Sequence, residues 1–227
     1  MPRKYNMERR AAAVEDTRRR IVEATVTCHA EKGILATSWQ DIAQRADVAV
    51  GTVYRHFPEL PGLMQACGHL VDERLALPAT EDVPELFRDA RSARERIARL
   101  VAEIFGVYER GAASIECARS ERHALPPLQQ WHEMIEERLD LLVATALDPL
   151  GADDNDRRLA RALTDLTVWR SLLERGFSET ETRDLTTRLL VCGLRSRLRD
   201  RGKQDDALQP SRSARTPVQE GRPWDDS

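Results

Sequence analysis

The segment at residues 37–58, TSWQDIAQRADVAVGTVYRHFP, decides how the fold of this chain is interpreted. Ser38 followed by Asp41 has the spacing of a capping box, which predicts the start of a short helix. Pro58 disfavours helical geometry in the residue before it, so a second short helix should end near His56. Three or four residues join the two helices, and this is the connection of a helix-turn-helix motif.

The rest of the chain also has the pattern of helices, because apolar residues recur every three or four positions and no period-two alternation predicts a strand. We therefore predict an all-α protein of about nine helices, with a three-helix N-terminal helix-turn-helix domain and a C-terminal helical bundle. Its last residues are rich in proline and charge, which predicts disorder. The expected segments are a flexible basic arm at 1–14, the helix-turn-helix domain at 15–60, the bundle at 61–200 and a disordered tail at 201–227.

Charge is distributed unevenly along the chain. The net charge is −3, but the first 57 residues contain ten Lys or Arg and seven Asp or Glu, so a basic module precedes an acidic body. No apolar run reaches the roughly 18 residues of a membrane span, and no secretory signal is visible at the N-terminus. The four cysteines are widely spaced without a Cys-x-x-Cys pair, which predicts buried, reduced thiols in a cytoplasmic protein.

From about Thr17 to Ala66 the sequence resembles the N-terminal domain of the TetR family of transcriptional regulators. The resemblance implies a homodimer, most often a repressor, that binds a palindrome-like operator in double-stranded DNA. It also implies a small-molecule effector bound in the C-terminal body, which is the effector-binding and dimerisation domain, and it implies no cofactor. The resemblance rests on Gly33, Thr37–Ser38, Asp41–Ile42–Ala43, Ala46, Val48, Gly51–Tyr54 and Phe57–Pro58.

The second helix of such a motif enters the major groove, and the first crosses the DNA backbone. Small residues at its start let the backbone approach DNA, and Tyr54, Arg55 and His56 can donate to phosphates or reach base edges. Val53 and Phe57 should point inward. Other roles stay open, such as a plain helix cap for Thr37 or a surface ion pair for Arg55. The predicted DNA-contacting residues are Thr37, Ser38, Ala49, Val50, Thr52, Tyr54, Arg55 and His56.

Two positions depart from the family pattern. Relatives often carry a lysine shortly after the Phe-Pro pair, where this chain has Glu59 and Leu60, and Val50 occupies a position that is often polar or cationic. Both changes weaken electrostatic attraction to DNA. The basic arm could compensate by lying in a minor groove, or it could be only a solubilising tail. Trp39 replaces a small aliphatic residue and should pack over the core of the motif, or lean on the DNA backbone.

Aromatic and sulfur-containing side chains recur on the predicted inner faces of the bundle helices. Helical bundles bind small molecules between their helices, with a few polar groups among apolar walls, so we expect a small apolar or aromatic effector. Each of these residues could instead be ordinary core. The candidate effector-binding residues are Phe105, Tyr108, Trp131, Met134 and Trp169.

The last two predicted helices have apolar stripes that would form a four-helix contact across a two-fold axis. Some of these leucines could belong to the core of one chain instead. Trp169 lies in the same stripe and cannot fully serve both the effector site and the interface. The candidate interface residues are Leu159, Leu163, Leu166, Leu173, Leu185, Leu189 and Cys192.

No enzymatic motif is present. The five histidines are scattered, and the chain lacks Glu-x-x-His pairs, a His-Glu-x-x-His motif, a glycine-rich phosphate loop and a Gly-x-Ser-x-Gly motif. We therefore predict no catalytic residue and no metal site. Two alternatives to the main hypothesis remain: a redox-sensing regulator that uses Cys67 or Cys117, and a helical small-molecule-binding protein that has lost DNA binding.

Overall fold

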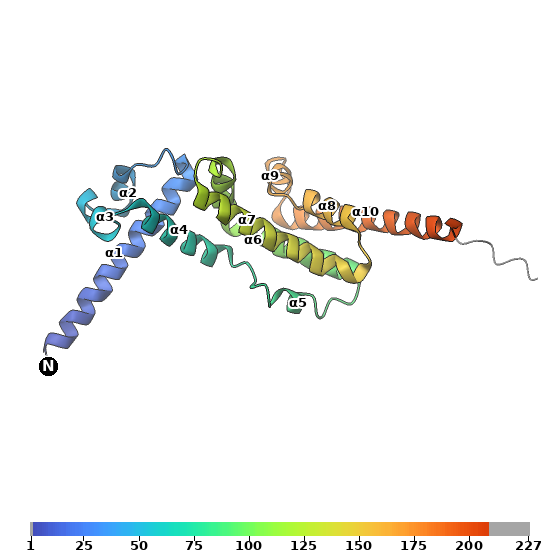
Figure 1. Ribbon diagram of the computed structural model, residues 1–227, viewed down its shortest axis with the longest axis horizontal. Coiled ribbons are helices and arrows are strands. Elements are labelled where there is room, and N and C mark those ends of the chain that lie inside the picture. The colour runs from blue at the N-terminus through green and yellow to red at the C-terminus, as the bar shows by residue number, and fades with distance from the viewer. Residues whose placement is uncertain (1, 209–227) are drawn as a thin grey trace, which may run out of the picture.

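The computed structural model of the chain describes residues 2–208, with side chains for residues 7–194. Every regular element within those residues is a helix, which confirms the predicted all-α class (Figure 1). In chain order the elements are α1 (Pro2–Lys32), α2 (Trp39–Ala46), α3 (Val50–His56), α4 (Leu60–Leu75), α5 (Val83–Leu86), α6 (Ala93–Glu121), α7 (Pro126–Leu147), the 3-10 helix η1 (Asp148–Leu150), α8 (Asp154–Leu163), α9 (Leu166–Glu174) and α10 (Glu179–Leu208).

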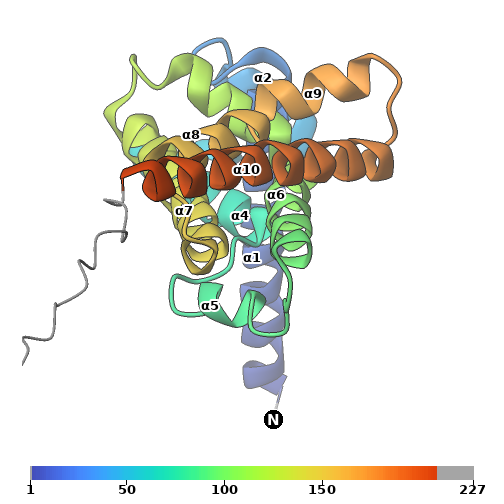
Figure 2. The ribbon, with the colours of Figure 1, turned by 90° about the vertical axis from the view of Figure 1, so that its right-hand side faces the viewer.

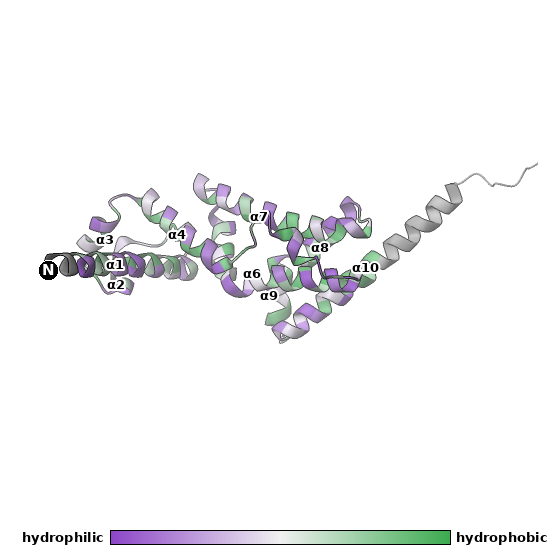
Figure 3. Ribbon diagram, turned by 90° about the horizontal axis from the view of Figure 1, so that it is seen from below, coloured by the Kyte–Doolittle hydropathy of each residue, from purple (hydrophilic) through white to green (hydrophobic). Residues whose placement is uncertain are grey.

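The helices form an elongated molecule with the helix-turn-helix at one end. Helices α1 to α4 gather there, the pair α6 and α7 fills the middle, and α8 to α10 lie at the other end (Figure 1). Helix α10 crosses the bundle and packs on α6, α8 and α9 (Figure 2). Polar and apolar residues alternate along the bundle helices, so each can bury one face and leave the other in water (Figure 3).

Helix starts follow the capping signals of the sequence. Asp41 N–H donates to Ser38 Oγ at 3.2 Å, and Ser38 N–H donates to Asp41 Oδ2 at 2.9 Å, which completes the predicted capping box. Ser178 and Glu181 have the same sequence spacing at the start of α10 and the same geometry, with Ser178 N–H donating to Glu181 Oε2 at 2.8 Å. Because these caps satisfy backbone groups that helix starts leave unpaired, short local signals were sufficient to locate the helices.

Two sequence expectations differ from the structure at the ends of the chain. We expected a flexible arm at residues 1–14, but α1 extends back to Pro2. An α-helix is roughly 10–12 Å wide with its side chains, and a minor groove is roughly 6 Å wide, so this helix does not fit there as an extended arm would. The tail was expected from residue 201, but α10 continues to Leu208, and residues 209–227 lie outside the described part.

Single residues interrupt two stretches of the bundle. Helix α6 continues through Gly111 as one element, with a kink where Gly111 has φ −157° and ψ 23°. A Cβ at this position would lie 2.2 Å from Leu75 Cδ2, so a larger residue would require the Leu75 side chain of α4 to move. The stretch before Gly176 is divided into α8 and α9, and Asp165 caps the start of α9.

Candidate nucleic-acid interface and effector cavity

Helix α3 presents a polar outer face and an apolar inner face. Val53 and Phe57 are buried in the core of the helix-turn-helix, as the sequence predicted. Tyr54 is 46% exposed, and Arg55 is exposed beside it, while His56, Val50 and Thr52 are half-buried. Ala49 is exposed at the N-cap. The residues predicted to contact DNA on α3 therefore all keep some exposed surface, although Val50 is partly buried against the core.

Trp39 holds Tyr54 in place. The two ring centroids are 4.9 Å apart with planes inclined by 34°, so a residue of α2 packs directly on the exposed tyrosine of α3. Aromatic pairs of this kind are worth roughly 0.5–1.5 kcal/mol beyond the burial of their area. Trp39 also packs against the hydrophobic core, in agreement with the first of its two predicted roles. The phenol of Tyr54 is thus presented to the solvent in a restricted orientation.

The turn before α2 contains the other two predicted contacts. Thr37 Oγ1 donates to the carbonyl of Gly33 at 2.6 Å, so its hydroxyl stabilises the turn rather than capping the helix. Ser38 is the N-cap, and its hydroxyl bonds to Asp41. Both side chains have internal partners, and the N-terminus of α2 is where backbone amides favour a phosphate.

Two arginines of α1 stabilise the helix-turn-helix by contacting backbone carbonyls and an aromatic ring. Arg20 donates to the carbonyls of Ala46 and, at 3.2 Å, Asp47, the residue with positive φ that ends α2. Arg18 stacks its guanidinium 4.7 Å from the centroid of the Phe57 ring. These contacts fix the turn between α2 and α3 against α1.

Two ion pairs join α2 to the C-terminal part of α1. Lys32 pairs with Asp41, and Arg45 pairs with Glu31. The hydrogen bond from Lys32, followed by those from Ser38, holds the pKa of Asp41 well below its usual range. The four side chains are 27–49% exposed, so each pair should stabilise the motif only modestly.

An apolar cavity of about 560 Å³ lies where the helix-turn-helix domain meets the bundle. Its walls come from α1 (Val26, His29), α4 (Met64, Cys67, Val71), α6 (Ser114, Cys117, Ala118) and the start of α7 (Leu128, Trp131), among others. This volume falls within the range of roughly 300–1,000 Å³ typical of small-molecule sites. Two of the four walls therefore belong to helices that also build the DNA-binding domain.

Few polar groups face this cavity. Asp72 is the one acidic or basic residue, apart from histidines, among its described lining residues, and its Oδ1 accepts a hydrogen bond from Trp131 Nε1 at 2.8 Å. Burial lowers the pKa of His29, although nearby Glu121 opposes the shift, so the imidazole is neutral near pH 7. The cavity thus offers an apolar surface and no fixed cation.

Only one of the five predicted effector-binding residues, Trp131, lines this cavity. Phe105, Tyr108 and Trp169 are buried in a row, with ring centroids 6.1 and 5.8 Å apart. Tyr108 Oη donates to the carbonyl of Thr164 at 3.0 Å, and burial raises the pKa of its phenol to about 12. These rings fill the space between α6 and α9, and Met134 packs against the same core, so the four residues are core rather than wall.

Sequence reasoning missed the contributions of α1 and α4 to the cavity. Met64, Cys67 and Val71 are spaced three and four residues apart, so they share one face of α4. That signal was present, but the same spacing is typical of a face buried against another helix.

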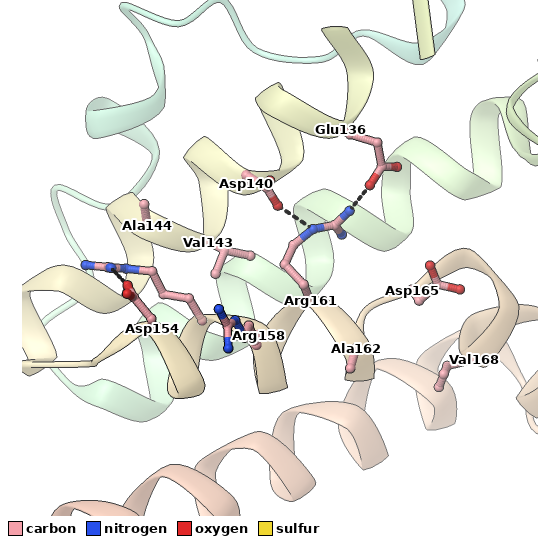
Figure 4. Close-up of a pocket in the computed structure, with 11 residues that line it drawn as sticks. Glu136, Asp140, Val143, Ala144, Asp154, Arg158, Arg161, Ala162, Asp165 and Val168 are labelled. Atoms are coloured by element: carbon pink, nitrogen blue, oxygen red, sulfur yellow. Dashed lines mark hydrogen bonds and ion pairs between the residues drawn. The ribbon is translucent and has the colours of Figure 1, made fainter. Parts of the chain in front are cut away.

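A second hollow lies between α7 and α8, with a volume of about 910 Å³ (Figure 4). Charged side chains that pair with one another line it. Arg161 donates to Glu136 at 2.6 Å and to Asp140 at 2.7 Å, and Arg157 pairs with Asp154 at 2.7 Å. Because these charges offset one another, the hollow lacks both the apolar character and the unbalanced charge that would define a ligand.

The predicted interface residues divide between the surface and the core. Leu166 is 3% exposed and belongs to the core of its own chain, which corrects its assignment to the interface. Leu189 is 49% exposed, and Cys192 is exposed one turn further along α10. The remaining candidates, Leu159, Leu163, Leu173 and Leu185, are half-buried.

The four cysteines are free thiols, and the environments of two of them suppress their reactivity. Burial raises the pKa of Cys67 to about 12, and burial also raises that of Cys117. The thiolate is the reactive form, so both residues are poor nucleophiles near pH 7. Within the described residues, no group of three or more His, Cys, Asp or Glu side chains could hold a metal ion. No described helix is long and apolar enough to cross a membrane.

The fold and this surface define a helix-turn-helix DNA-binding protein with a helical C-terminal body. Residues 21–67 match the sequence model of a family described as bacterial regulatory proteins, tetR family. The N-terminal domain at residues 21–67 is therefore a tetR-family domain, and this family consists of bacterial regulatory proteins.

Known proteins with similar sequences are repressors. The HTH-type transcriptional repressor KstR of Rhodococcus jostii is 27% identical over 162 residues, which cover 71% of this chain and 73% of that protein. KstR of Mycobacterium tuberculosis is 27% identical over 187 residues, which cover 79% of this chain and 82% of that protein. The similarity therefore extends beyond the helix-turn-helix into the body.

Solved structures with the same fold include the transcriptional regulator FadR from Bacillus subtilis in complex with stearoyl-CoA. It has a TM-score of 0.54 and 21% identity, and the match covers 77% of this chain and 97% of the FadR chain. The multidrug binding protein EbrR complexed with malachite green has a TM-score of 0.50 and 23% identity, with coverages of 77% and 95%. At these identities the two structures establish the fold alone.

The shielded thiol of Cys67 leads to a prediction for alkylation. Iodoacetamide at pH 7.5 should modify Cys67 in the folded protein at least about a hundredfold more slowly than in urea, because only a minute fraction of a thiol with a pKa of about 12 is ionised. Mass spectrometry of the alkylated peptides measures both rates. Equal rates in the two states would restore the redox-sensing hypothesis.

Proposed function

We propose that the chain is a homodimeric, cytoplasmic repressor that releases a palindrome-like operator when a small, neutral, apolar effector occupies the cavity between α1, α4, α6 and α7. The observation that carries this proposal is the composition of the cavity walls. Val26 of α1 and Val71 of α4 face the same space as Ala118 of α6. An effector that changes the spacing of these helices must also change the position of the helix-turn-helix.

The proposed DNA interface combines α3 with the turn before α2. Tyr54, Arg55 and His56 would donate to phosphates or base edges, and Thr37 and Ser38 would place the N-terminus of α2 near a phosphate. Ala49, Val50 and Thr52 would lie close to the groove. A two-fold dimer would hold two such surfaces about 34–36 Å apart, or a multiple of that distance, to match a palindrome-like site.

The effector class follows from the lining of the cavity. An anionic ligand would lack a counterion, because no Lys or Arg belongs to the described lining and the imidazole of His29 is neutral near pH 7. An apolar body with one hydrogen-bonding group suits the walls better, and Asp72, Ser114 and Gln65 can receive such a group.

The proposed dimer interface is the outer face of α8 to α10. Leu189 and Cys192 are exposed there, and Leu159, Leu163, Leu173 and Leu185 are half-buried, so they retain surface for a partner. Contact with a partner would remove this apolar surface from water, which favours association. We assign DNA binding to the helix-turn-helix domain at 15–60, and effector binding and dimerisation to the domain at 61–200.

The effector must bind the DNA-incompetent arrangement more tightly, because a ligand with equal affinity for both arrangements shifts nothing. A coupling of roughly 1–3 kcal/mol would weaken operator binding on the order of 5–150-fold. Selection of bound fragments from genomic DNA at near-physiological salt tests the proposal directly. Enrichment of a palindrome-like site is expected. No enrichment by a folded dimer would favour the alternative of a helical small-molecule-binding protein that has lost DNA binding.

Replacing Tyr54 with Ala should weaken binding to the selected DNA roughly 10–100-fold, because a hydrogen bond to a charged phosphate is worth about 1.5–3 kcal/mol. Fluorescence anisotropy of labelled DNA measures the change. Tyr54→Phe is the matched control, since it keeps the ring on Trp39 and removes only the hydroxyl. Wild-type affinity in Tyr54→Ala, with unchanged circular dichroism, would show that the recognition surface lies elsewhere.

Replacing Leu189 with Glu should dissociate the dimer, because a buried, unpaired carboxylate is costly in an apolar contact. Sedimentation velocity at micromolar concentration would show a shift from dimer to monomer. Val14→Glu places the same charge at a residue that is 56% exposed on α1 and should leave the dimer intact. A fully dimeric Leu189→Glu variant would argue against this interface.

Replacing Ala118 with Trp should fill the cavity and lower the affinity for Nile red, a neutral apolar fluorophore, by about tenfold or more, because the apolar surface of the probe could no longer be buried. Fluorescence titration measures the dissociation constant. Ala102→Trp, on an exposed position of the same helix, is the control. Equal probe affinity in the wild type and in Ala118→Trp would exclude this cavity as the binding site.

A further inference from the structure

One carboxylate connects the bundle directly to the turn between α1 and α2, where the helix-turn-helix begins. Glu121, the last residue of α6, accepts two backbone hydrogen bonds on Oε2, from Ile34 N–H at 2.9 Å and from Leu35 N–H at 3.0 Å. Both donors lie just after α1, about 86 positions earlier in the chain. Hydrogen bonds from amides to an ionised carboxylate are roughly twice as strong as neutral ones, so this contact is a specific link between the two domains.

The backbone around this carboxylate is shaped to admit it. Gly33 has a φ of +91°, which side chains other than glycine rarely allow. A Cβ on Gly33 would also lie 2.2 Å from Glu121 Oε1. The turn therefore needs glycine both for its conformation and for the approach of Glu121.

The same turn leads directly into α2. Thr37 N–H donates to the carbonyl of Ile34 at 3.2 Å, and Thr37 Oγ1 donates to the carbonyl of Gly33 at 2.6 Å. Ser38 then caps α2. Holding the amides of Ile34 and Leu35 thus fixes the start of the helix whose N-terminus is proposed to approach a phosphate.

Glu121 ends the segment of α6 that lines the apolar cavity, although its own side chain is not part of the lining. Ser114, Cys117 and Ala118 line the cavity from the segment of α6 that ends at Glu121, and Leu125 lines it just beyond. This segment follows the kink at Gly111, where the regular helical geometry is interrupted. A ligand in the cavity therefore presses on the short segment that carries the carboxylate.

We propose that Glu121 is a positioning residue, and that a ligand in the cavity acts through it on the start of the helix-turn-helix. In the DNA-competent arrangement its carboxylate holds the turn at residues 33–38. An effector that displaces the segment at 112–121 withdraws the carboxylate from the two amides and releases the start of α2. The proposal rests on the proposed function, because it assigns the route of regulation to the same cavity and the same DNA surface.

Hydrogen–deuterium exchange of the full chain tests the contact without DNA. Glu121→Ala should speed exchange in the peptide at residues 33–38 by roughly 10–100-fold, as expected for the loss of bonds to a charged acceptor. Saturating Nile red should speed the same exchange in the wild type and add nothing in the variant. Glu121→Gln keeps the shape and one acceptor oxygen, so it should fold normally and give an intermediate rate. Glu103→Ala, on the same helix away from the cavity lining, should match the wild type.

The second arm measures Nile red affinity with and without the DNA recovered by selection. DNA should weaken probe binding on the order of 5–150-fold in the wild type, and this ratio should approach one in Glu121→Ala while the probe still binds the free variant. Exchange unaffected by Glu121→Ala or by the probe, or full coupling in that variant, overturns this proposal alone. A wild type that binds neither the DNA nor the probe overturns the proposed function and this proposal together.

Discussion

Helix α1 packs on two domains at once, and the rest of the structure depends on this shared packing. Ile21 and Val22 are buried in the core of the helix-turn-helix, while Val26 and His29 face the cavity beside α4 and α6. A single helix cannot move one of these faces and leave the other in place. Because protein interiors are densely packed, a displacement of α1 at the cavity would also disturb its contacts in the core of the helix-turn-helix.

Local signals predicted much of the fold from the sequence. The capping boxes at Ser38 and Ser178 and the inward positions of Val53 and Phe57 depend on neighbours within a few residues, so spacing alone identifies them. The continuation of α1 to Pro2 was missed because that segment has no apolar stripe to indicate a packed helix.

The cavity could not be placed from sequence because it depends on which helices meet. Phe105 and Trp169 have the spacing of an inner face, and an inner face can be either a filled core or a cavity wall. The structure assigns them to the core, where large rings fill the space between α6 and α9. Of the candidates, Trp131 alone lies at the junction of the two domains.

Several basic side chains of the N-terminal domain contact other groups of the protein itself. Arg20 binds carbonyls at the end of α2, Arg18 covers the ring of Phe57, and Lys32 and Arg45 pair with carboxylates. The count of basic residues in the first 57 positions therefore overstates the positive charge available to phosphates. Each phosphate contact adds to the salt dependence of DNA binding, so this distribution of basic side chains predicts a shallow dependence.

The shared walls of the cavity have a consequence for protein engineering by domain exchange. A chimera joined at the end of the helix-turn-helix, near Leu60, would combine α1 from one parent with α4, α6 and α7 from the other. Such a hybrid would retain a helix-turn-helix and a bundle but lose the matched surfaces that enclose the apolar cavity. An exchange that keeps the cavity intact therefore has to be confined to α2 and α3, because α1 belongs to both the helix-turn-helix and the cavity wall.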